Sequence, residues 1–107
     1  MKVTAWNNGK HHRSGAGYGI KISATDRDRH FKKSWKSVFV LLPSGDEVEV
    51  NTDKVSFWND SCRELISKGI GEWLIETNLA PWPSGSPPSL ELTMTRERSF
   101  ALKERER

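Results

Sequence analysis

Three histidines are the side chains of this sequence best suited to acid–base chemistry: His11, His12 and His30. A histidine that moves protons while nearby cations stabilise the charge on phosphate is the arrangement needed to cleave RNA. However, His11 and His12 are adjacent, so in a strand they would point to opposite faces and would not share a metal ion. No acidic residues are spaced to complete a site. We therefore expect a protein with no catalytic residues, no metal and no cofactor, with a histidine-based nuclease as the less favoured alternative.

The lysines and arginines are the second group with a chemical role, because they attract phosphate. The chain has a net charge of +3, but this charge is unevenly spread. Residues 1–36 hold nine Lys or Arg against two Asp, a net charge of +7, whereas residues 37–92 have a net charge of −6 and residues 93–107 one of +2. Such an asymmetry predicts a partner of opposite charge, unless the basic and acidic regions neutralise each other within the fold or across a head-to-tail dimer.

A short helix is expected to gather four of the cations on one face. Thr25 followed by Asp28 is a variant of the capping box and predicts a helix over 26–36. At about 100° per residue, Phe31 and Trp35 share the face that would pack on the core. The opposite face carries four cations at positions i, i+3, i+4 and i+7: Arg29, Lys32, Lys33 and Lys36.

This basic stripe favours a small non-catalytic module that binds nucleic acid, because Lys and Arg facing phosphates supply much of the affinity of such proteins. Lys10, Arg13 and Lys21 would extend the basic surface. Trp6 and Tyr18 are candidates for stacking on bases if their rings face outward. DNA and RNA both fit this prediction. The alternative is a protein-interaction or self-associating (dimeric) module, in which the basic face meets an acidic partner protein or the acidic face of a second copy.

The glycines at positions 15, 17 and 19 resemble a phosphate-binding loop in composition alone. They lead into a predicted strand, whereas a P-loop needs Gly-Lys-Ser/Thr at the start of a helix. A tight turn with a close backbone approach is expected instead. Two known nucleic-acid-binding folds also do not fit this sequence. The strand at 46–50 is acidic and lacks the aromatic residues of an RNA-recognition motif, and residues 71–79 carry two Glu and no cation, unlike a recognition helix.

A small sheet must position these side chains. Apolar patterning predicts strands at 3–6, 17–23, 37–42, 47–50, 90–95 and 100–102. Turn residues join the third strand to the fourth, and the fifth to the sixth, as hairpins. In the second strand, Tyr18, Ile20 and Ile22 lie on one face. The helix at 26–36 and a second helical region at about 59–79, interrupted near Gly69 and Gly71, complete the pattern.

The resulting fold class is α+β, with a five- or six-stranded, mostly antiparallel sheet and two helical regions. Two architectures fit this order of elements. Residues 17–95 follow the βαββαβ order of a ferredoxin-like core, and a small partial barrel with its helices on one side fits as well. The Pro-rich segment 80–89 is expected to be a loop, whose Trp82 either covers the core or anchors a partner protein.

Length and composition indicate one domain, over residues 1–102, followed by a charged tail at 103–107. Leu, Ile, Val and Phe are sparse, but five Trp supply large surfaces to bury. No apolar run approaches the ~18 residues of a membrane span, and residues 1–6 lack the core of a signal peptide, which predicts a soluble cytoplasmic protein. The single Cys62 rules out an internal disulfide and is expected to be a small apolar core residue.

Overall fold

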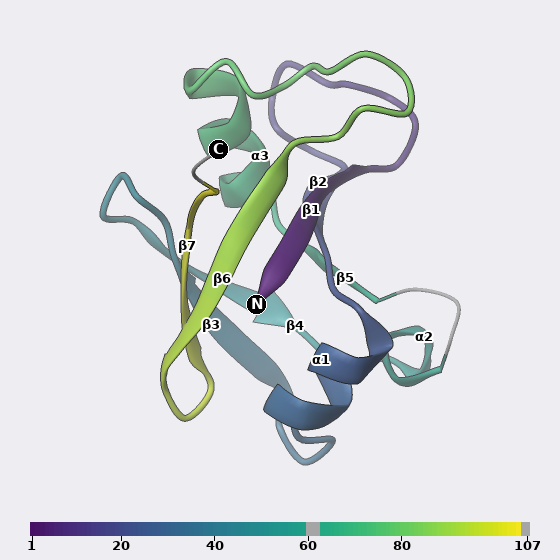
Figure 1. The fold of residues 1–107 in the computed structure, drawn as a ribbon, viewed down its shortest axis with the longest axis vertical. Coiled ribbons are helices and arrows are strands. Elements are labelled where there is room, and N and C mark those ends of the chain that lie inside the picture. The colour runs from purple at the N-terminus through teal and green to yellow at the C-terminus, as the bar shows by residue number, and fades with distance from the viewer. Residues whose placement is uncertain (60–62, 106–107) are drawn as a thin grey trace.

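The computed structural model describes residues 1–59 and 63–105, so the role expected for Cys62 lies outside the described residues. Within these residues the chain forms seven strands and three helices (Figure 1). The strands are β1 Lys2–Asn7, β2 Tyr18–Lys21, β3 Ser37–Leu41, β4 Glu47–Asn51, β5 Glu64–Ile66, β6 Ser89–Arg96 and β7 Ser99–Glu104. The helices are α1 Ala24–His30, α2 Val55–Trp58 and α3 Lys68–Glu76. None of these helices is long and apolar enough to cross a membrane.

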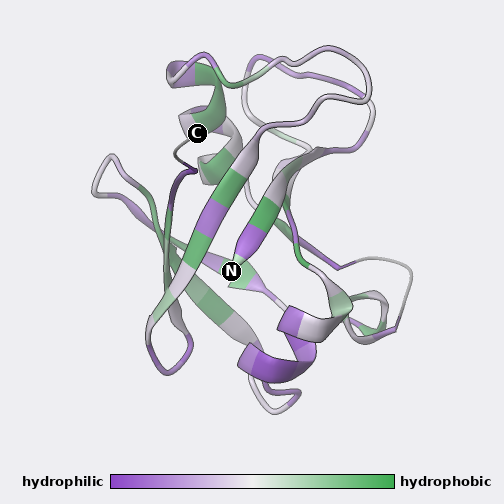
Figure 2. Cartoon of the chain, in the orientation of Figure 1, coloured by the Kyte–Doolittle hydropathy of each residue, from purple (hydrophilic) through white to green (hydrophobic). Residues whose placement is uncertain are grey.

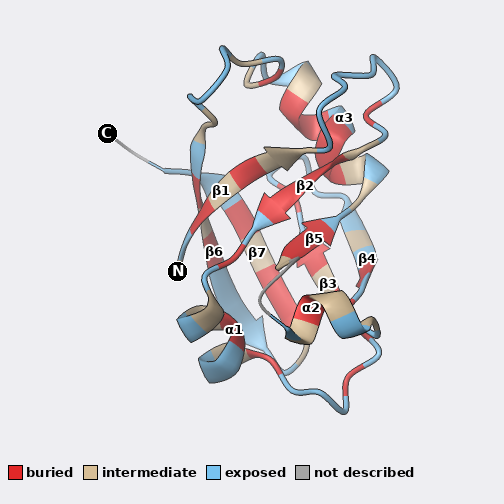
Figure 3. Cartoon of the chain, turned by 90° about the vertical axis from the view of Figure 1, so that its right-hand side faces the viewer, coloured by how far each residue is buried: buried red, intermediate tan, exposed pale blue. Residues whose placement is uncertain are grey.

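The strands form one curled sheet in the order β4-β3-β7-β6-β1-β2-β5. Neighbouring strands are antiparallel except β3 and β7, which run parallel. The two end strands, β4 and β5, lie in contact without pairing, so the sheet nearly closes into a barrel (Figure 3). Of the two architectures that fit the sequence, the partial barrel is observed, but its helices lie at both ends of the barrel rather than on one side. A ferredoxin-like core would make β2, α1 and β3 a parallel βαβ unit, whereas β1, β6 and β7 separate β2 from β3.

The α+β class is confirmed, but the sheet has seven strands rather than five or six. The additional strand, β5, lies inside the region predicted to be helical, and its Leu65 is paired with Ile20 of β2 in the interior. Short apolar segments fit the periodicity of a strand and of a helix equally well, so it is the pairing with β2 that makes this segment a strand. Only Ser67 separates β5 from α3. At the other end of the chain, β7 continues to Glu104, two residues into the predicted tail.

The first helix is shorter than the predicted span of 26–36. α1 is capped by Ser23 rather than Thr25, because the Ser23 hydroxyl accepts a hydrogen bond from the Asp26 N–H at 3.1 Å. The helix ends at Phe31, whose backbone is extended, with φ −121° and ψ 148°. Phe31 and Trp35 are buried as predicted, but they reach the core from an irregular segment. Both aromatic side chains therefore pack in the core as predicted, but the helix expected to carry the cations on its opposite face ends before it reaches the lysines.

The interior of the barrel follows the alternation expected from the sequence. Figure 2 shows hydrophobic and hydrophilic residues alternating along β6, whose Leu90 and Leu92 are fully buried. Tyr18, Ile20 and Ile22 are buried together, as predicted from their spacing. The residues that alternate with them on β1, β2 and β5 form an outer face of the barrel. Figure 3 shows this face in front, with α1 and α2 below it and α3 and the long loops above.

Candidate functional site

The four cations predicted to line one helix face are exposed, but they do not form a stripe. Only Arg29 belongs to α1. The other three follow in the irregular segment 31–36: Lys32, Lys33 and Lys36. The Nζ of Lys32 lies 3.4 Å from Oε1 of Glu97, and the Nζ of Lys36 lies 3.4 Å from Oδ2 of Asp53. The predicted basic helix is therefore wrong, because the helix ends before the lysines and two of them face carboxylates.

Arg27 of α1 is a structural residue, although it adds to the positive charge of the first 36 residues. Its guanidinium is buried, and Nη1 donates hydrogen bonds to the backbone carbonyls of Phe57 at 2.9 Å and of Asn59 at 2.8 Å. Its Nε and Nη2 each lie 3.1 Å from Oδ1 of Asp28. This charge is used to fix α1 against α2, so it does not contribute to a surface for phosphate.

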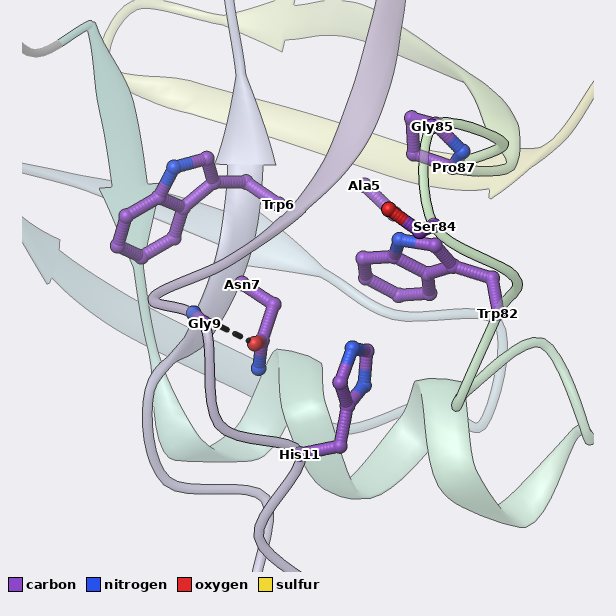
Figure 4. A pocket seen from close by; sticks show the side chains of 9 residues that line it. All are labelled: Ala5, Trp6, Asn7, Gly9, His11, Trp82, Ser84, Gly85 and Pro87. Carbon is purple, nitrogen blue, oxygen red and sulfur yellow. Dashed lines mark hydrogen bonds between the residues drawn. The ribbon is translucent and has the colours of Figure 1, made fainter.

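An aromatic cleft of about 580 Å³ lies at the opposite end of the molecule from α1. The end of β1 and the following loop 8–17 form one wall, and the Pro-rich loop 80–88 forms the other (Figure 4). Nine residues line this aromatic cleft, and none carries a carboxylate: Ala5, Trp6, Asn7, Gly9, His11, Trp82, Ser84, Gly85 and Pro87. Exposed Lys10 lies between two lining residues of the loop, and exposed Arg13 follows. Within residues 1–59 and 63–105 neither cation makes an ion pair.

Three aromatic rings meet at the aromatic cleft: His11, Tyr18 and Trp82. They pack edge to face, with centroids separated by 4.9 Å for His11–Trp82, 5.3 Å for His11–Tyr18 and 5.7 Å for Tyr18–Trp82. The Tyr18 hydroxyl lies 2.5 Å from Nδ1 of His11, and Tyr18 is only 1% exposed. Tyr18 therefore does not meet the condition on which its stacking role depended, because its ring is too buried to receive a base. Trp82 is half-buried, so it both packs against the core and lines the cleft.

Burial raises the pKa of Tyr18 above its usual value of 10.0. Because the folded-state pKa exceeds the unfolded one, the stability that Tyr18 contributes is fully present below about pH 10 and is lost as the pH rises through the folded-state pKa. Tyr18 is the only tyrosine of the chain, so tyrosinate absorbance reports it alone. We expect a titration midpoint above 10 in the native protein and near 10 in urea. Equal midpoints in the two states would contradict this prediction.

Trp6 lies on the opposite side of β1 from Trp82, although both residues line the aromatic cleft (Figure 4). In the strand register Trp6 is opposite Gly19 of β2, and it alternates with the buried Val3 and Ala5. Its side chain therefore belongs to the outer face of the barrel, where it is half-buried. The role of Trp6 as a stacking residue stays a prediction.

Close backbone contact with α3 fixes the position of loop 8–17. Gly15 has φ +89°, and a Cβ there would lie 2.7 Å from the backbone nitrogen of Glu72. A Cβ on Gly71 would overlap the carbonyl oxygen of Gly15. The close backbone approach predicted from the glycine pattern is therefore present. At the start of the loop, Oδ1 of Asn7 accepts a hydrogen bond of 2.9 Å from the N–H of Gly9, which shapes the turn.

The three histidines do not form a common site. His11 borders the aromatic cleft, and the adjacent His12 is exposed. His30 is the last residue of α1, which lies at the opposite end of the molecule (Figure 1). In the part of the chain that the structure describes, no three His, Cys, Asp or Glu side chains are grouped so that they could hold a metal ion.

Acidic side chains gather around a second groove, of about 310 Å³, between the β3–β4 hairpin and α3. Four carboxylates line this acidic groove: Asp46, Glu47, Glu72 and Glu76. One molecule thus carries an acidic groove and a basic loop, which is the pairing that a self-associating module would use.

Comparisons of the chain with protein-family models, with curated proteins and with solved structures find no significant match. Three features of the structure bear on the function of the chain. They are the rings of Trp82 and His11, the cations of loop 8–17, and a cleft lining without carboxylates.

Proposed function

We propose that the protein binds single-stranded nucleic acid at the aromatic cleft. The observation that supports this best is the pair of Trp82 and His11 rings at a cleft lined without carboxylates, with exposed Lys10 and Arg13 on the same loop as His11. Proteins that bind single strands combine aromatic side chains, on which bases stack, with cations that follow the backbone. Neither feature distinguishes one base from another, so we expect binding with little sequence specificity.

A single strand suits this surface better than a duplex. The cleft presents rings, and a ring can stack only on a base that is not already stacked within a helix. Duplex readers usually place a protein helix in the major groove. α1 has seven residues and its Arg27 is buried, whereas Glu72 and Glu76 of α3 line the acidic groove. Neither helix suits a groove bordered by phosphates.

The proposal predicts salt-dependent binding that requires the loop cations. Fluorescence anisotropy would measure the affinity for a labelled oligothymidylate of about 12 nucleotides, a length within the site sizes of small barrels. We expect Lys10→Ala/Arg13→Ala to weaken binding. The slope of log affinity against log salt should become shallower by roughly 1.4, because each phosphate of a single strand that is no longer neutralised reduces it by about 0.7.

A matched control removes two cations from the other end of the molecule. Lys32→Ala/Lys36→Ala changes the net charge by the same amount, but both lysines have carboxylates beside them. We expect this variant to keep the native slope, and an equal loss in both double variants would contradict binding at the cleft. A native protein that binds no oligonucleotide even at low salt would contradict the proposal altogether. Sedimentation would then test self-association through the acidic groove.

A further inference from the structure

The outer face of β1, β2 and β5 extends from the end of the molecule that holds α3 and the long loops toward α1 (Figure 3). The strand register places Trp6 of β1, Gly19 of β2 and Ile66 of β5 in one row across this face. Trp6 is half-buried and Ile66 is 39% exposed, so both reach the surface. These three residues form an apolar platform, called here the outer platform, which adjoins the cleft at Trp6, on the other side of β1 from Trp82.

Gly19 gives the outer platform its shape. A Cβ at this position would overlap the carbonyl oxygen of Leu65, so the close approach of β5 requires glycine. Gly19 is buried although it lies on the outer face and has no side chain of its own, and the backbone of β5 lies against it. An aromatic residue opposite a glycine on the adjacent strand packs over that glycine. The Trp6 ring can therefore rest on the sheet with one side toward Gly19 and the other toward a ligand.

A cation lies at the far edge of the outer platform. Lys21 follows Gly19 by two residues on the same face, and it is diagonal to Trp6 at a typical Cα separation of about 7–8 Å. Lys21 is exposed, and it makes no ion pair within the described ranges. Its neighbour across the β2–β5 pair, Glu64, is buried. Lys21 thus supplies a cation on the outer face, in addition to the cations of loop 8–17.

We infer that the bound single strand leaves the aromatic cleft across β1 and continues over the outer platform, stacking a second base on Trp6 and placing a phosphate at Lys21. This inference rests on the proposed function and specifies its ligand. One nucleotide at Trp82, one crossing β1, one at Trp6 and one ending at Lys21 make a site of roughly four nucleotides, the lower limit for small barrels that bind single strands. The ligand class is therefore an oligonucleotide, because a mononucleotide or dinucleotide would occupy the cleft alone.

A length series tests this path. Oligothymidylates from the dinucleotide to the octanucleotide would be titrated by fluorescence anisotropy, and affinity is expected to rise steeply up to roughly four nucleotides. Trp6→Leu keeps an apolar side chain over Gly19 but removes the stacking surface. We expect it to weaken binding of the octanucleotide by about 5- to 150-fold, the effect of removing one stacked base, and to weaken binding of the dinucleotide less, because Trp6 forms only part of the cleft lining. Lys21→Ala should make the salt slope shallower by about 0.7 for the octanucleotide only.

Trp6→Phe is the matched control for Trp6→Leu. Both variants keep an apolar side chain at this position, but only Phe retains a ring on which a base can stack. We expect this variant to keep most of the octanucleotide affinity that Trp6→Leu loses. A dinucleotide that binds as tightly as the octanucleotide, or a Trp6→Leu variant that weakens both ligands equally, would overturn the path and leave the cleft as a binding site. Absence of binding at every oligonucleotide length would instead contradict the proposed function itself.

Discussion

Replacing Gly71 by alanine is expected to remove most oligonucleotide binding while the protein stays folded. Alanine favours a helix over glycine by about 1 kcal/mol, which offsets part of the steric cost in α3. The new Cβ would overlap the carbonyl oxygen of Gly15, so loop 8–17 must move away from α3. That movement displaces Lys10, His11 and Arg13 together. Without two cations at the phosphates and one ring, binding should be roughly 100-fold weaker, as measured by anisotropy.

Gly69→Ala is the matched control for this prediction. It makes the same change in the same helix, but its Cβ would meet the Val48 side chain of β4 at 2.5 Å rather than the backbone of loop 8–17. We expect oligonucleotide affinity to remain close to native in Gly69→Ala, and urea unfolding would show that both variants are folded. If Gly71→Ala binds like the native protein, the contact with Gly15 does not position the cations.

Replacing Trp82 by alanine is expected to weaken the binding of short and long oligonucleotides alike. Its ring is held edge to face against His11 and Tyr18, and it lines the aromatic cleft. Removing one aromatic stacking partner costs about 1–3 kcal/mol per base, or roughly 5- to 150-fold in affinity. This dependence on length distinguishes Trp82 from Trp6, whose replacement should affect long ligands more than short ones. Anisotropy with the dinucleotide and the octanucleotide measures both effects.

Trp58→Ala provides the comparison, because Trp58 is also half-buried but lies at the end of α2, below the outer face in Figure 3. Its Nε1 donates a hydrogen bond to the Thr52 carbonyl at 3.1 Å, so its replacement is expected to lower stability. We expect no change in oligonucleotide affinity for the folded variant. Equal losses in Trp58→Ala and Trp82→Ala would mean that reduced stability, rather than stacking, explains both.

The sheet could be predicted from the sequence wherever apolar residues alternate between clear turns. Tyr18, Ile20 and Ile22 identified the inner face of β2, and the turn at 43–46 identified the β3–β4 hairpin. Such patterns depend only on residues close together in the sequence, so they predict a strand or turn without knowledge of how the rest of the chain folds. β5 could not be found in this way. Its three residues are too few to show a period, and they form a strand because β2 offers an unpaired edge.

The candidate site depends on contacts between distant parts of the chain. The spacing of Phe31 and Trp35 suits a helix, but the chain turns at Phe31 and still buries both rings, so the side-chain pattern could not reveal where α1 ends. The aromatic cleft joins residues 5–11 to residues 82–87 because β1 pairs with β6. The only local signals were aromatic or basic residues within glycine-, serine- and proline-rich loops, namely His11 and Trp82.

The contact between β4 and β5 makes the barrel adjustable. Six hydrogen-bonded ladders join the described strands, whereas β4 and β5 lie in contact without a ladder between them. The circumference of the barrel can therefore change at this seam without breaking a ladder. Because Ser67 alone separates β5 from α3, displacement of β5 carries α3 and the loop that rests on Gly71. We therefore expect a displacement at this seam to reach one wall of the proposed binding cleft through α3 and loop 8–17.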